Sequence, residues 1–551
     1  MTEHPDSAAD FAPAPSHRRI CLVADGPATS QLAELLAPMG HQITILLPEQ
    51  SPPDRTSQSD IASHQHAPRV IPGIDLVELP QPRGITNPCA LWRLSYAAYL
   101  WLCSQSFDVI CFPERNGIGF HSLSAKSLGL AFPKTLLVVM VTGPSLLRAM
   151  AQQVLPIGPS PLRRDFMERQ SVALADLVIA PDQAMLSMLR KEDWPLPAAT
   201  TMCASLSEDL SDDNHERWQR VFSQTPLPNR TLALPELASQ AAPPLVSVCL
   251  VHFNRPRFLQ QALDSLRGQD YHFFEVILVD DGSTDPQALT TLKQIESEFS
   301  ERGWKLIRQQ NRYLGAARNT AANMARGKYL LFMDDDNVAK PHELRTLVAV
   351  AEYASADILT CHLERFASQQ SPLETKLATE HWGPLGMALA AGLVENVFGD
   401  ANALIRRHVF QEVGGFTELR GVGHEDWEFF ARASLKGYRL EVVPESLFYY
   451  RVQPGSMLSS SKRNVNLLRS ASPYLEGMPP WLRQVMLGFL AQHLALYQPS
   501  GGQPVLTEAE ALTDEQVLLL KNRVYDALRP YPRMLNLLRH SAQAVLRIAH
   551  R

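Results

Sequence analysis

The stretch that most constrains this chain is YLLFMDDDN, residues 329–337. Its five apolar residues are typical of a buried strand, and three aspartates, Asp334, Asp335 and Asp336, follow directly. Because an unpaired buried carboxylate is costly, such a cluster at the end of a strand favours a bound cation. Carboxylate oxygens suit Mg²⁺ or Mn²⁺ and leave coordination places for water and phosphate. Alone, the motif is equally consistent with a solvated acidic turn.

Two earlier apolar runs also end in polar residues. VSVCLV leads into residues 252–254, and EVILV leads into Asp280 and Asp281. Helical patterns separate the three runs, which predicts βαβ units and a largely parallel sheet. Ligands of such sheets bind beyond the carboxyl ends of the strands. We therefore expect Asp280, Asp281, Asp334 and Asp336 to share one crevice.

Five segments between residue 245 and about residue 460 resemble family 2 glycosyltransferases of GT-A fold. They are VSVCLVHFNRPRFLQQALDSLRGQ, VILVDDGSTD, NRYLGAARNTAANMARGKYLLFMDDDN, FGDANALIRRHVFQEVGGF and GHEDWEFF, in the order of the family. Each segment is a weak signal, but together they are specific. The resemblance implies an α/β fold: a nucleotide-diphospho-sugar transferase domain with a mostly parallel sheet at 245–463.

The resemblance also implies how the donor is bound. Asp334 and Asp336 correspond to the DxD pair of the family, with Asp336 as the more direct ligand of Mn²⁺ or Mg²⁺. Asp335 takes the variable middle position and receives no role. The residues expected to bind the nucleotide sugar are Asn254, Arg255, Asp280, Asp281, Arg318, Asp334 and Arg451. For Arg318 an ordinary helix-surface position is the alternative, and His252 stands where the family usually has threonine.

The segment GHEDWEFF carries the expected general base. By resemblance Asp426 takes the proton of the acceptor hydroxyl, with Glu425 as the second candidate, in a single displacement that inverts the anomeric carbon. Without the resemblance, acids at a helix N-terminus are explained by the helix dipole alone. Trp427 would stack on a sugar or fill the core.

The N-terminal region shows strand–helix–strand patterns without a GxGxxG phosphate fingerprint. Its segments FDVICFPERNGIGFHSLSAKSLG and MERQSVALADLVIAPDQAMLSML resemble the N-terminal half of a family 4 glycosyltransferase of GT-B type. No second GT-B half follows, so we expect this domain to bind acceptor or to act as a scaffold. Arg115, Asn116 and His121 lie near a strand end, where a surface loop is the preferred interpretation over a ligand site.

Length and composition set the remaining expectations. A chain of 551 residues is too long for a single hydrophobic core, so more than one domain is expected. The formal charge of −6 gives no indication that the chain binds nucleic acid. We expect a disordered 1–17, a Rossmann-like domain at 18–203, a linker at 204–244 with a short helix near 216–222, the transferase domain at 245–463 and a helical extension at 464–551. No signal peptide and no run of ~18 apolar residues is visible.

Seven cysteines without metal spacing indicate a reducing compartment, so a cytoplasmic location is expected. The basic helix predicted at 534–551 is expected to pack on the protein, and contact with the inner face of the membrane is the alternative.

The favoured function is transfer of a sugar, with UDP-sugars as the first donors to test, to a hydroxyl of a saccharide, lipid-linked or protein-linked acceptor in surface glycan synthesis. One alternative is a non-catalytic glycan-binding or scaffold protein. Another is a sugar nucleotidyltransferase, which usually has a glycine-rich and basic loop after its first strand. The segment HFNRPR is not such a loop.

Overall fold

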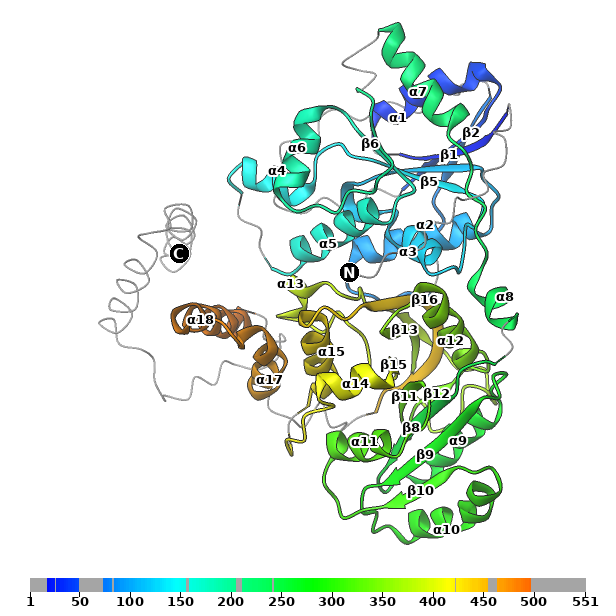
Figure 1. The fold of residues 1–551 in the computed structure, drawn as a ribbon, viewed down its shortest axis with the longest axis vertical. Coiled ribbons are helices and arrows are strands. Elements are labelled where there is room, and N and C mark those ends of the chain that lie inside the picture. Colours follow the sequence, from blue (N-terminus) through cyan, green and yellow to red (C-terminus); the bar gives the residue numbers. More distant parts are fainter. Residues whose placement is uncertain are drawn as a thin grey trace.

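The computed structural model describes most of the chain between residues 17 and 496 and contains two sheets (Figure 1). The described residues are 17–24, 26–48, 73–81, 84–154, 158–204, 211–239, 242–421, 423–453 and 463–496. Nearly all of the segment expected to be disordered, and the basic helix predicted at 534–551, lie outside these residues. None of the described helices is long and apolar enough to cross a membrane.

The first sheet has seven parallel strands in the order β3-β2-β1-β4-β5-β6-β7. The strands are β1 Arg19–Val23, β2 Gln42–Leu47, β3 Ile74–Glu78, β4 Val109–Pro113, β5 Leu136–Met140, β6 Leu177–Ala180 and β7 Thr200–Met202. The helices between them are α1 Pro27–Leu36, α2 Ala90–Cys103, α3 Phe120–Ser127, α4 Ser145–Ala151, α5 Ser160–Ala173 and α6 Gln183–Lys191. This doubly wound order confirms the predicted Rossmann-like unit, while its likeness to family 4 stays a prediction.

The second sheet has nine strands and is mixed. Its order is β10-β9-β8-β11-β15-β13-β16-β12, with β14 paired to β13. The strands are β8 Val246–His252, β9 Phe274–Asp280, β10 Lys305–Arg308, β11 Tyr329–Asp334, β12 Val338–Ala339, β13 Ile358–Phe366, β14 Glu380–Trp382, β15 Leu404–Arg406 and β16 Leu440–Arg451. The first four strands in this order run parallel, as predicted, and β15 joins β11 antiparallel.

Local sequence signals explain the helices around the second sheet. They are α9 Pro256–Arg267, α10 Pro286–Glu301, α11 Leu314–Asn323, α12 Glu343–Ala354, α13 Leu389–Gly392, α14 Arg407–Val413 and α15 Glu425–Leu435. Asp285 caps α10 by accepting from the backbone N–H of Gln287 and Ala288, and Pro286 occupies the first turn. The small residues of α11 permit close packing, because a Cβ on Gly315 would lie 2.4 Å from the carbonyl oxygen of Thr417.

The stretch predicted as an interdomain linker holds two packed helices, α7 Asp212–Gln224 and α8 Ala233–Ala238. Trp218 and Phe222 of α7 belong to a core under the first sheet. Ala233 and Leu237 of α8 belong to the core of the second sheet, where α8 lies against α12 (Figure 1). The helix predicted near 216–222 is part of α7, so this stretch joins the two units by packing on both.

One continuous core spans the two units and contains both Trp92 of α2 and Phe398 of the second unit. The indole N–H of Trp92 donates to the carbonyl oxygen of Pro384 at 3.3 Å, and Asn87 donates to that of Gly383 at 2.7 Å. The two units are therefore packed against each other through shared apolar side chains.

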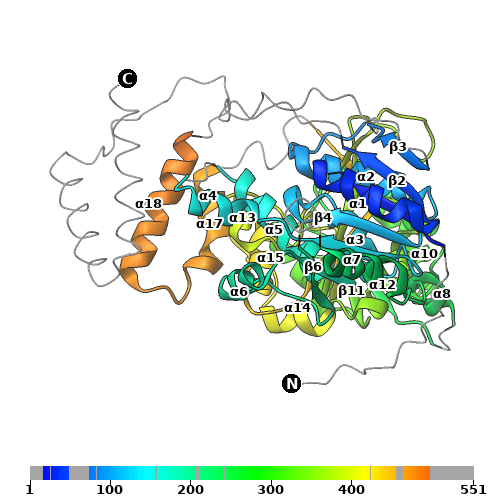
Figure 2. The same ribbon diagram turned by 90° about the horizontal axis from the view of Figure 1, so that it is seen from above.

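The chain after the second sheet forms α17 Arg463–Leu475 and α18 Pro480–Leu496. As far as residue 496, these helices confirm the helical extension predicted from residue 464. Both lie together at one side of the molecule (Figure 2), and α17 packs directly on α15.

Candidate active site

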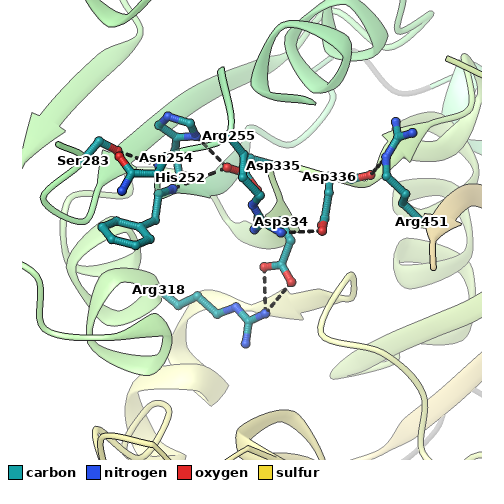
Figure 3. A network of polar contacts seen from close by, with 10 residues as sticks. His252, Asn254, Arg255, Ser283, Arg318, Asp334, Asp335, Asp336 and Arg451 are labelled. Carbon is teal, nitrogen blue, oxygen red and sulfur yellow. Dashed lines mark hydrogen bonds and ion pairs between the residues drawn. The ribbon is translucent and has the colours of Figure 1, made fainter. Parts of the chain in front are cut away.

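The ends of β9, β8 and β11 meet at one edge of the second sheet. In the parallel register His252 pairs with Asp280, and Val251 pairs with Asp334. Asp334, at the end of β11, and the two aspartates that follow it therefore lie beside the loop after β8 (Figure 3). This arrangement brings together the residues expected to share a crevice.

Asp334 is paired with a buried arginine of α11. One terminal nitrogen of Arg318, Nη2, donates to both carboxylate oxygens of Asp334 at 2.7 and 3.0 Å, and Nη1 donates to Glu425 at 2.9 Å (Figure 3 shows the first contacts). Burial opposes the charge on the guanidinium, but Asp334 and Glu425 outweigh burial and raise the pKa of Arg318. Arg318 thus joins the DDD segment to the start of α15 and is not a surface residue.

Asp335 has a structural position that the sequence did not indicate. Its side chain is fully buried, and the Nδ1 of His252 donates to it at 2.6 Å. The guanidinium of Arg255 forms an ion pair with the other oxygen at 2.5 Å. Asp335 therefore holds the loop after β8 against the turn after β11, and its neighbours on either side keep their carboxylates toward the crevice.

Asp336 is less enclosed than Asp335: 19% of the Asp336 side chain is exposed, whereas Asp335 is fully buried and Asp334 is 25% exposed. Nη1 of Arg255 contacts Oδ2 of Asp336 at 2.5 Å. Burial raises the pKa of Asp336 to about 6, with Arg255 opposing the shift and Asp335 adding to it. The carboxylate charge at this position is thus only partly compensated by the protein.

The expected base lies in the first turn of α15, across Arg318 from the aspartates. Asp426 is partly exposed, and its Oδ1 accepts from the backbone N–H of Trp427 at 2.8 Å. Burial and the charge of Glu425 raise the pKa of Asp426 to about 6, against the effect of Arg318. A carboxylate with a pKa near neutrality is suited to accept a proton.

Asp400 joins this cluster and was not among the predicted residues. Burial raises the pKa of Asp400 to about 7, and the charges of Asp426 and Asp334 add to the shift. The segment FGDANALIRR contains Asp400, and an acid between glycine and alanine was the one available signal. Among the described residues, Arg318 contacts Asp334 and Glu425, and Arg469 lies 3.8 Å from Glu425. With Asp400 and Asp426, the cluster therefore holds more carboxylates than nearby arginines.

Three of the predicted nucleotide-binding residues hold the loops of the crevice. Asp281 accepts from the backbone N–H of Arg312 at 2.9 Å and of Tyr313 at 2.8 Å. Asp280 accepts from the N–H of Ser283 at 3.2 Å. Asn254, at a φ of 54°, bridges the loops after β8 and β9 through Ser283 and residues 284–285. Their contacts with a nucleotide stay a prediction.

Arg451 lies at the far side of Asp336 and donates to its carbonyl oxygen at 3.2 Å (Figure 3). Its guanidinium sits over the rings of Phe258 and Phe366 and also donates to Gln261 at 2.5 Å. Burial lowers the pKa of Arg451 to about 10. These contacts fix the end of β16 next to the DDD segment.

Helix α17 holds the loop that leads into α15. The backbone N–H of Gly423 donates to the side-chain oxygen of Asn466 at 2.9 Å, and Arg469 donates to the carbonyl oxygen of Gly423 at 3.1 Å. Arg469 also lies 3.8 Å from Glu425. The next residue, His424, has a φ of 63°, which is uncommon for a residue with a side chain. The C-terminal extension thus helps to fix the start of α15.

Comparison with known families identifies the central part of the chain. The model of "Glycosyl transferase family 2" matches residues 247–414, from β8 to the end of α14. This part of the chain is a family 2 glycosyltransferase domain. The match includes the aspartates after β9 and β11, whereas Asp426 lies beyond its end. The predicted GT-A type of the glycosyltransferase domain is confirmed.

Curated relatives of the glycosyltransferase domain share about a quarter of its residues. The putative glycosyltransferase EpsH of Bacillus subtilis is 25% identical over 228 residues, which are 40% of this chain and 65% of EpsH. The O-antigen biosynthesis protein RfbC of Myxococcus xanthus is 26% identical over 279 residues, 46% of this chain and 20% of RfbC. The chain thus spans just under two thirds of EpsH.

Two solved structures show weaker similarity. TarS 1–349 of S. aureus in complex with UDP-GlcNAc has 20% identity and a TM-score of 0.37, covering 53% of this chain and 83% of that chain. The mannosyltransferase PcManGT from Pyrobaculum calidifontis, in complex with GDP-Man and Mn²⁺, has 18% identity and a TM-score of 0.33. The match covers 57% of this chain and 91% of PcManGT.

The carboxylates of the glycosyltransferase domain fit a cation that substrate helps to bind. Within the described residues, no three His, Cys, Asp or Glu side chains are close enough to hold a metal ion by themselves. Asp334 and Asp336 nevertheless present hard oxygen ligands. Of the two carboxylate oxygens of Asp336, only Oδ2 takes part in the contacts described above. Mg²⁺ is commonly bound by one or two carboxylates, with phosphates and water completing its shell. The donor set fits that pattern.

Proposed function

We propose that this chain transfers a sugar from a nucleotide-diphosphate sugar, with UDP-sugars as the first candidates, to a hydroxyl of a saccharide, lipid-linked or protein-linked acceptor. Surface glycan synthesis in the cytoplasm is the setting we infer. The seven cysteines are all free thiols, which suits a reducing compartment. The names of EpsH and RfbC support a role in glycan assembly.

One observation carries the proposal. Arg318 bridges Asp334 at the end of β11 and Glu425 at the start of α15, so donor-side and acceptor-side carboxylates share one polar network. A transferase needs both functions within one site, because proximity supplies much of its rate. A glycan-binding scaffold would gain nothing from burying this excess of negative charge.

In the proposed reaction, Asp426 accepts the proton of the acceptor hydroxyl as that oxygen attacks the anomeric carbon. The bond from the anomeric carbon to the diphosphate breaks, and the nucleoside diphosphate leaves with the bonding electrons. A single displacement of this kind inverts the anomeric configuration. Asp426 lies close enough to Asp334 for their charges to interact, which suits an acceptor held next to the donor.

Asp334 and Asp336 would hold a divalent cation, Mn²⁺ or Mg²⁺, with donor phosphates. Such a cation supplies charge neutralisation for the departing diphosphate when bound. Arg255 now contacts Asp335 and Asp336, and its guanidinium is placed to move toward the phosphates once those carboxylates are neutralised. Asp335 stays buried with His252 and keeps the two neighbouring carboxylates in place.

The test is a screen of UDP-, GDP- and dTDP-sugars for protection against thermal unfolding, with and without Mn²⁺. A ligand that binds only the folded protein raises its melting temperature by mass action. We expect one class of nucleotide sugar to give a Mn²⁺-dependent increase. No protection by any donor, together with no release of nucleoside diphosphate on incubation, would exclude a transferase that uses these donors.

A further inference from the structure

One buried carboxyl group, that of Glu343 at the start of α12, takes no part in the site described above. Its side chain is fully buried, and among the described residues no lysine, arginine or histidine forms an ion pair with it. A carboxyl group in such surroundings binds a proton, because an isolated buried charge is costly. Burial raises the pKa of Glu343 to about 8, with a hydrogen bond from Asn402 opposing the shift.

The partner of Glu343 is an amide with one donor and one acceptor. Nδ2 of Asn402 donates to Oε1 of Glu343 at 2.5 Å. Oε2 of Glu343 and Oδ1 of Asn402 are both buried without a hydrogen-bond partner within the described part of the chain. Both oxygens are acceptors while Glu343 is ionised, so neither can satisfy the other. A proton on Oε2 makes it a donor to Oδ1, and one proton then satisfies both atoms.

Asn402 also holds the loop that carries Asp400. The backbone N–H of Asn402 donates to Oδ1 of Asp400 at 2.9 Å. From Leu404 the chain forms β15, which pairs with β11, the strand that ends at Asp334. A shift of Asn402 would therefore move Asp400 relative to Asp334.

The other end of this loop is fixed by local contacts. Nδ2 of Asn396 donates to the carbonyl oxygen of Gly399 at 2.8 Å, and its Oδ1 accepts from the N–H of Phe398 at 3.1 Å. The hydroxyl of Thr360 on β13 donates to the carbonyl oxygen of Phe398 at 2.7 Å. Glu343 and Asn402 complete the support of the loop on the side that leads into β15.

We propose that Glu343 is a positioning residue of the transfer site. Its carboxylic acid O–H donates to Oδ1 of Asn402, and this acid–amide pair fixes the loop that carries Asp400. The charges of Asp426 and Asp334 reach Asp400, so this loop borders the carboxylate cluster. The effect on rate rests on the proposed function, whereas the acid–amide pair rests on the contacts of Glu343 and Asn402 alone.

Other ionisable groups surround the pair. The buried thiol of Cys361 on β13 is subject to the charges of Glu343, Asp400 and Lys340. Burial raises the pKa of Cys361 well above its ordinary value, so the thiol is neutral. Lys340 is paired with Glu364 at 2.6 Å. Because Asp400 has a pKa of about 7, the titration of Glu343 has to be isolated by substituting Glu343 itself.

The first experiment compares the melting temperatures of the wild type and Glu343→Gln as the pH is raised. Glutamine has the shape of the protonated acid and can form both hydrogen bonds to Asn402. The proton of Glu343 stabilises the fold fully below pH 4.5, and this contribution is lost as the pH rises through about 8. Glu343→Gln, which needs no proton, should therefore melt increasingly above the wild type over this range.

Glu352→Gln is the matched control on the same helix. Glu352 is paired with Lys328 at 2.6 Å, so it gains from its charge. Its substitution should not raise the melting temperature at pH 7, and no increase with pH is expected.

The second experiment measures release of nucleoside diphosphate by the wild type, Glu343→Met and Glu343→Gln. Methionine fills the position but forms no hydrogen bond with Asn402. We expect kcat of Glu343→Met to fall by about tenfold to hundredfold with donor KM changed little, because small misplacements in a site are costly. The conservative variant Glu343→Gln should recover most of that loss.

Two results would overturn the proposal. One is a melting temperature of Glu343→Gln that does not rise with pH relative to the wild type. The other is equal kcat in Glu343→Met and Glu343→Gln, whether normal or reduced. Should Glu343→Met fail to fold, the melting comparison and the kcat of Glu343→Gln decide. If the wild type itself shows no turnover, the proposed function fails, whereas the melting comparison still decides whether the acid–amide pair exists.

Discussion

Asp335 is a buried residue whose contacts with His252 and Arg255 hold Asp334 and Asp336 in position. Both of its oxygens face cationic or N–H groups, from His252 and Arg255, in a fully buried position. Asp335→Asn removes the negative charge and leaves Arg255 without one partner. Arg255 is 40% exposed and keeps its pair with Asp336, so no buried charge is left alone. Because hydrogen bonds to charged groups contribute roughly 1.5–3 kcal/mol each, we expect a lower melting temperature.

The matched control is Asp213→Asn on α7, which breaks an exposed pair with Arg217. Exposed pairs contribute about 1 kcal/mol or less, so this variant should melt close to the wild type. Thermal unfolding followed by circular dichroism measures both variants. Equal melting temperatures for the two would show that Asp335 is not a structural anchor.

Asp426 is tested by separating chemistry from donor binding. Asp426→Asn retains an oxygen that can accept from the N–H of Trp427 but loses the proton acceptor. Transfer should fall by on the order of 10²–10⁴, while donor affinity changes only a few-fold. In the wild type, the transfer rate should fall about tenfold per pH unit below about 6, where Asp426 becomes protonated.

The melting temperature of Asp426→Asn distinguishes the general-base role from the alternative, in which Asp426 only stabilises the N-terminus of α15 through the helix dipole. The pKa of Asp426 is raised from 3.8 to about 6 on folding, so its protonation stabilises the fold below pH 3.8, and this contribution is lost as the pH rises through about 6. At pH 7 the neutral asparagine should therefore melt at the same temperature or higher. A lower melting temperature with a normal rate would assign Asp426 to the helix dipole alone.

At the scale of elements, α17 is expected to act on catalysis through the loop before α15. Arg469→Met removes the donor to the carbonyl oxygen of Gly423 and to that of Thr417. Since this loop sets the position of Glu425 and Asp426, we predict a lower kcat with donor KM changed little. Leu468→Ala, on the exposed side of the same helix, is the control.

Steady-state kinetics of both variants decides this point. A fall in stability of Arg469→Met with an unchanged kcat would make α17 a packing element only. Restoration of part of the kcat by Arg469→Lys would support the positioning role, because a lysine can still reach one of the carbonyl oxygens.

The elements of the glycosyltransferase domain were predictable because periodicity and capping residues act locally. The apolar runs of β8, β9 and β11 and the cap at Asp285 are examples. The same local signals placed Asp280 and Asp334 at one edge. They could not show that Asp335 is buried with His252, that the charge of Asp426 reaches Asp400, or that α17 holds Gly423, since these interactions join segments apart in sequence.

At the scale of the whole molecule, the polar composition of 204–244 predicted a linker with one short helix near 216–222, whereas the stretch holds two packed helices, α7 and α8. The spacing of Trp218 and Phe222, four residues apart, was the signal of a buried helical face. Helix α7 packs on the first unit and α8 packs on the second, so the connecting stretch is bound to both. The two units also share one apolar core. Independent folding of the units is therefore less expected than the sequence suggested.

A fragment of residues 245–496 tests this conclusion. It exposes Leu385 and the neighbours of Trp92 that the first unit covers in the full chain. We predict that the fragment melts at a lower temperature than the full chain and tends to aggregate, since exposed apolar patches are aggregation sites. A monomeric fragment with the melting temperature and donor affinity of the full chain would show that the first unit is dispensable.

The most direct test of the account is release of nucleoside diphosphate by the wild type and by Asp336→Ala, measured with Mn²⁺, Mg²⁺ or a chelator. Asp336 is the most exposed of the two charged carboxylates that Arg255 contacts, so its removal should leave the fold intact. We expect cation-dependent turnover by the wild type and none by Asp336→Ala, with equal melting temperatures. Undiminished turnover by a well-folded Asp336→Ala protein, or turnover that a chelator does not affect, would contradict it.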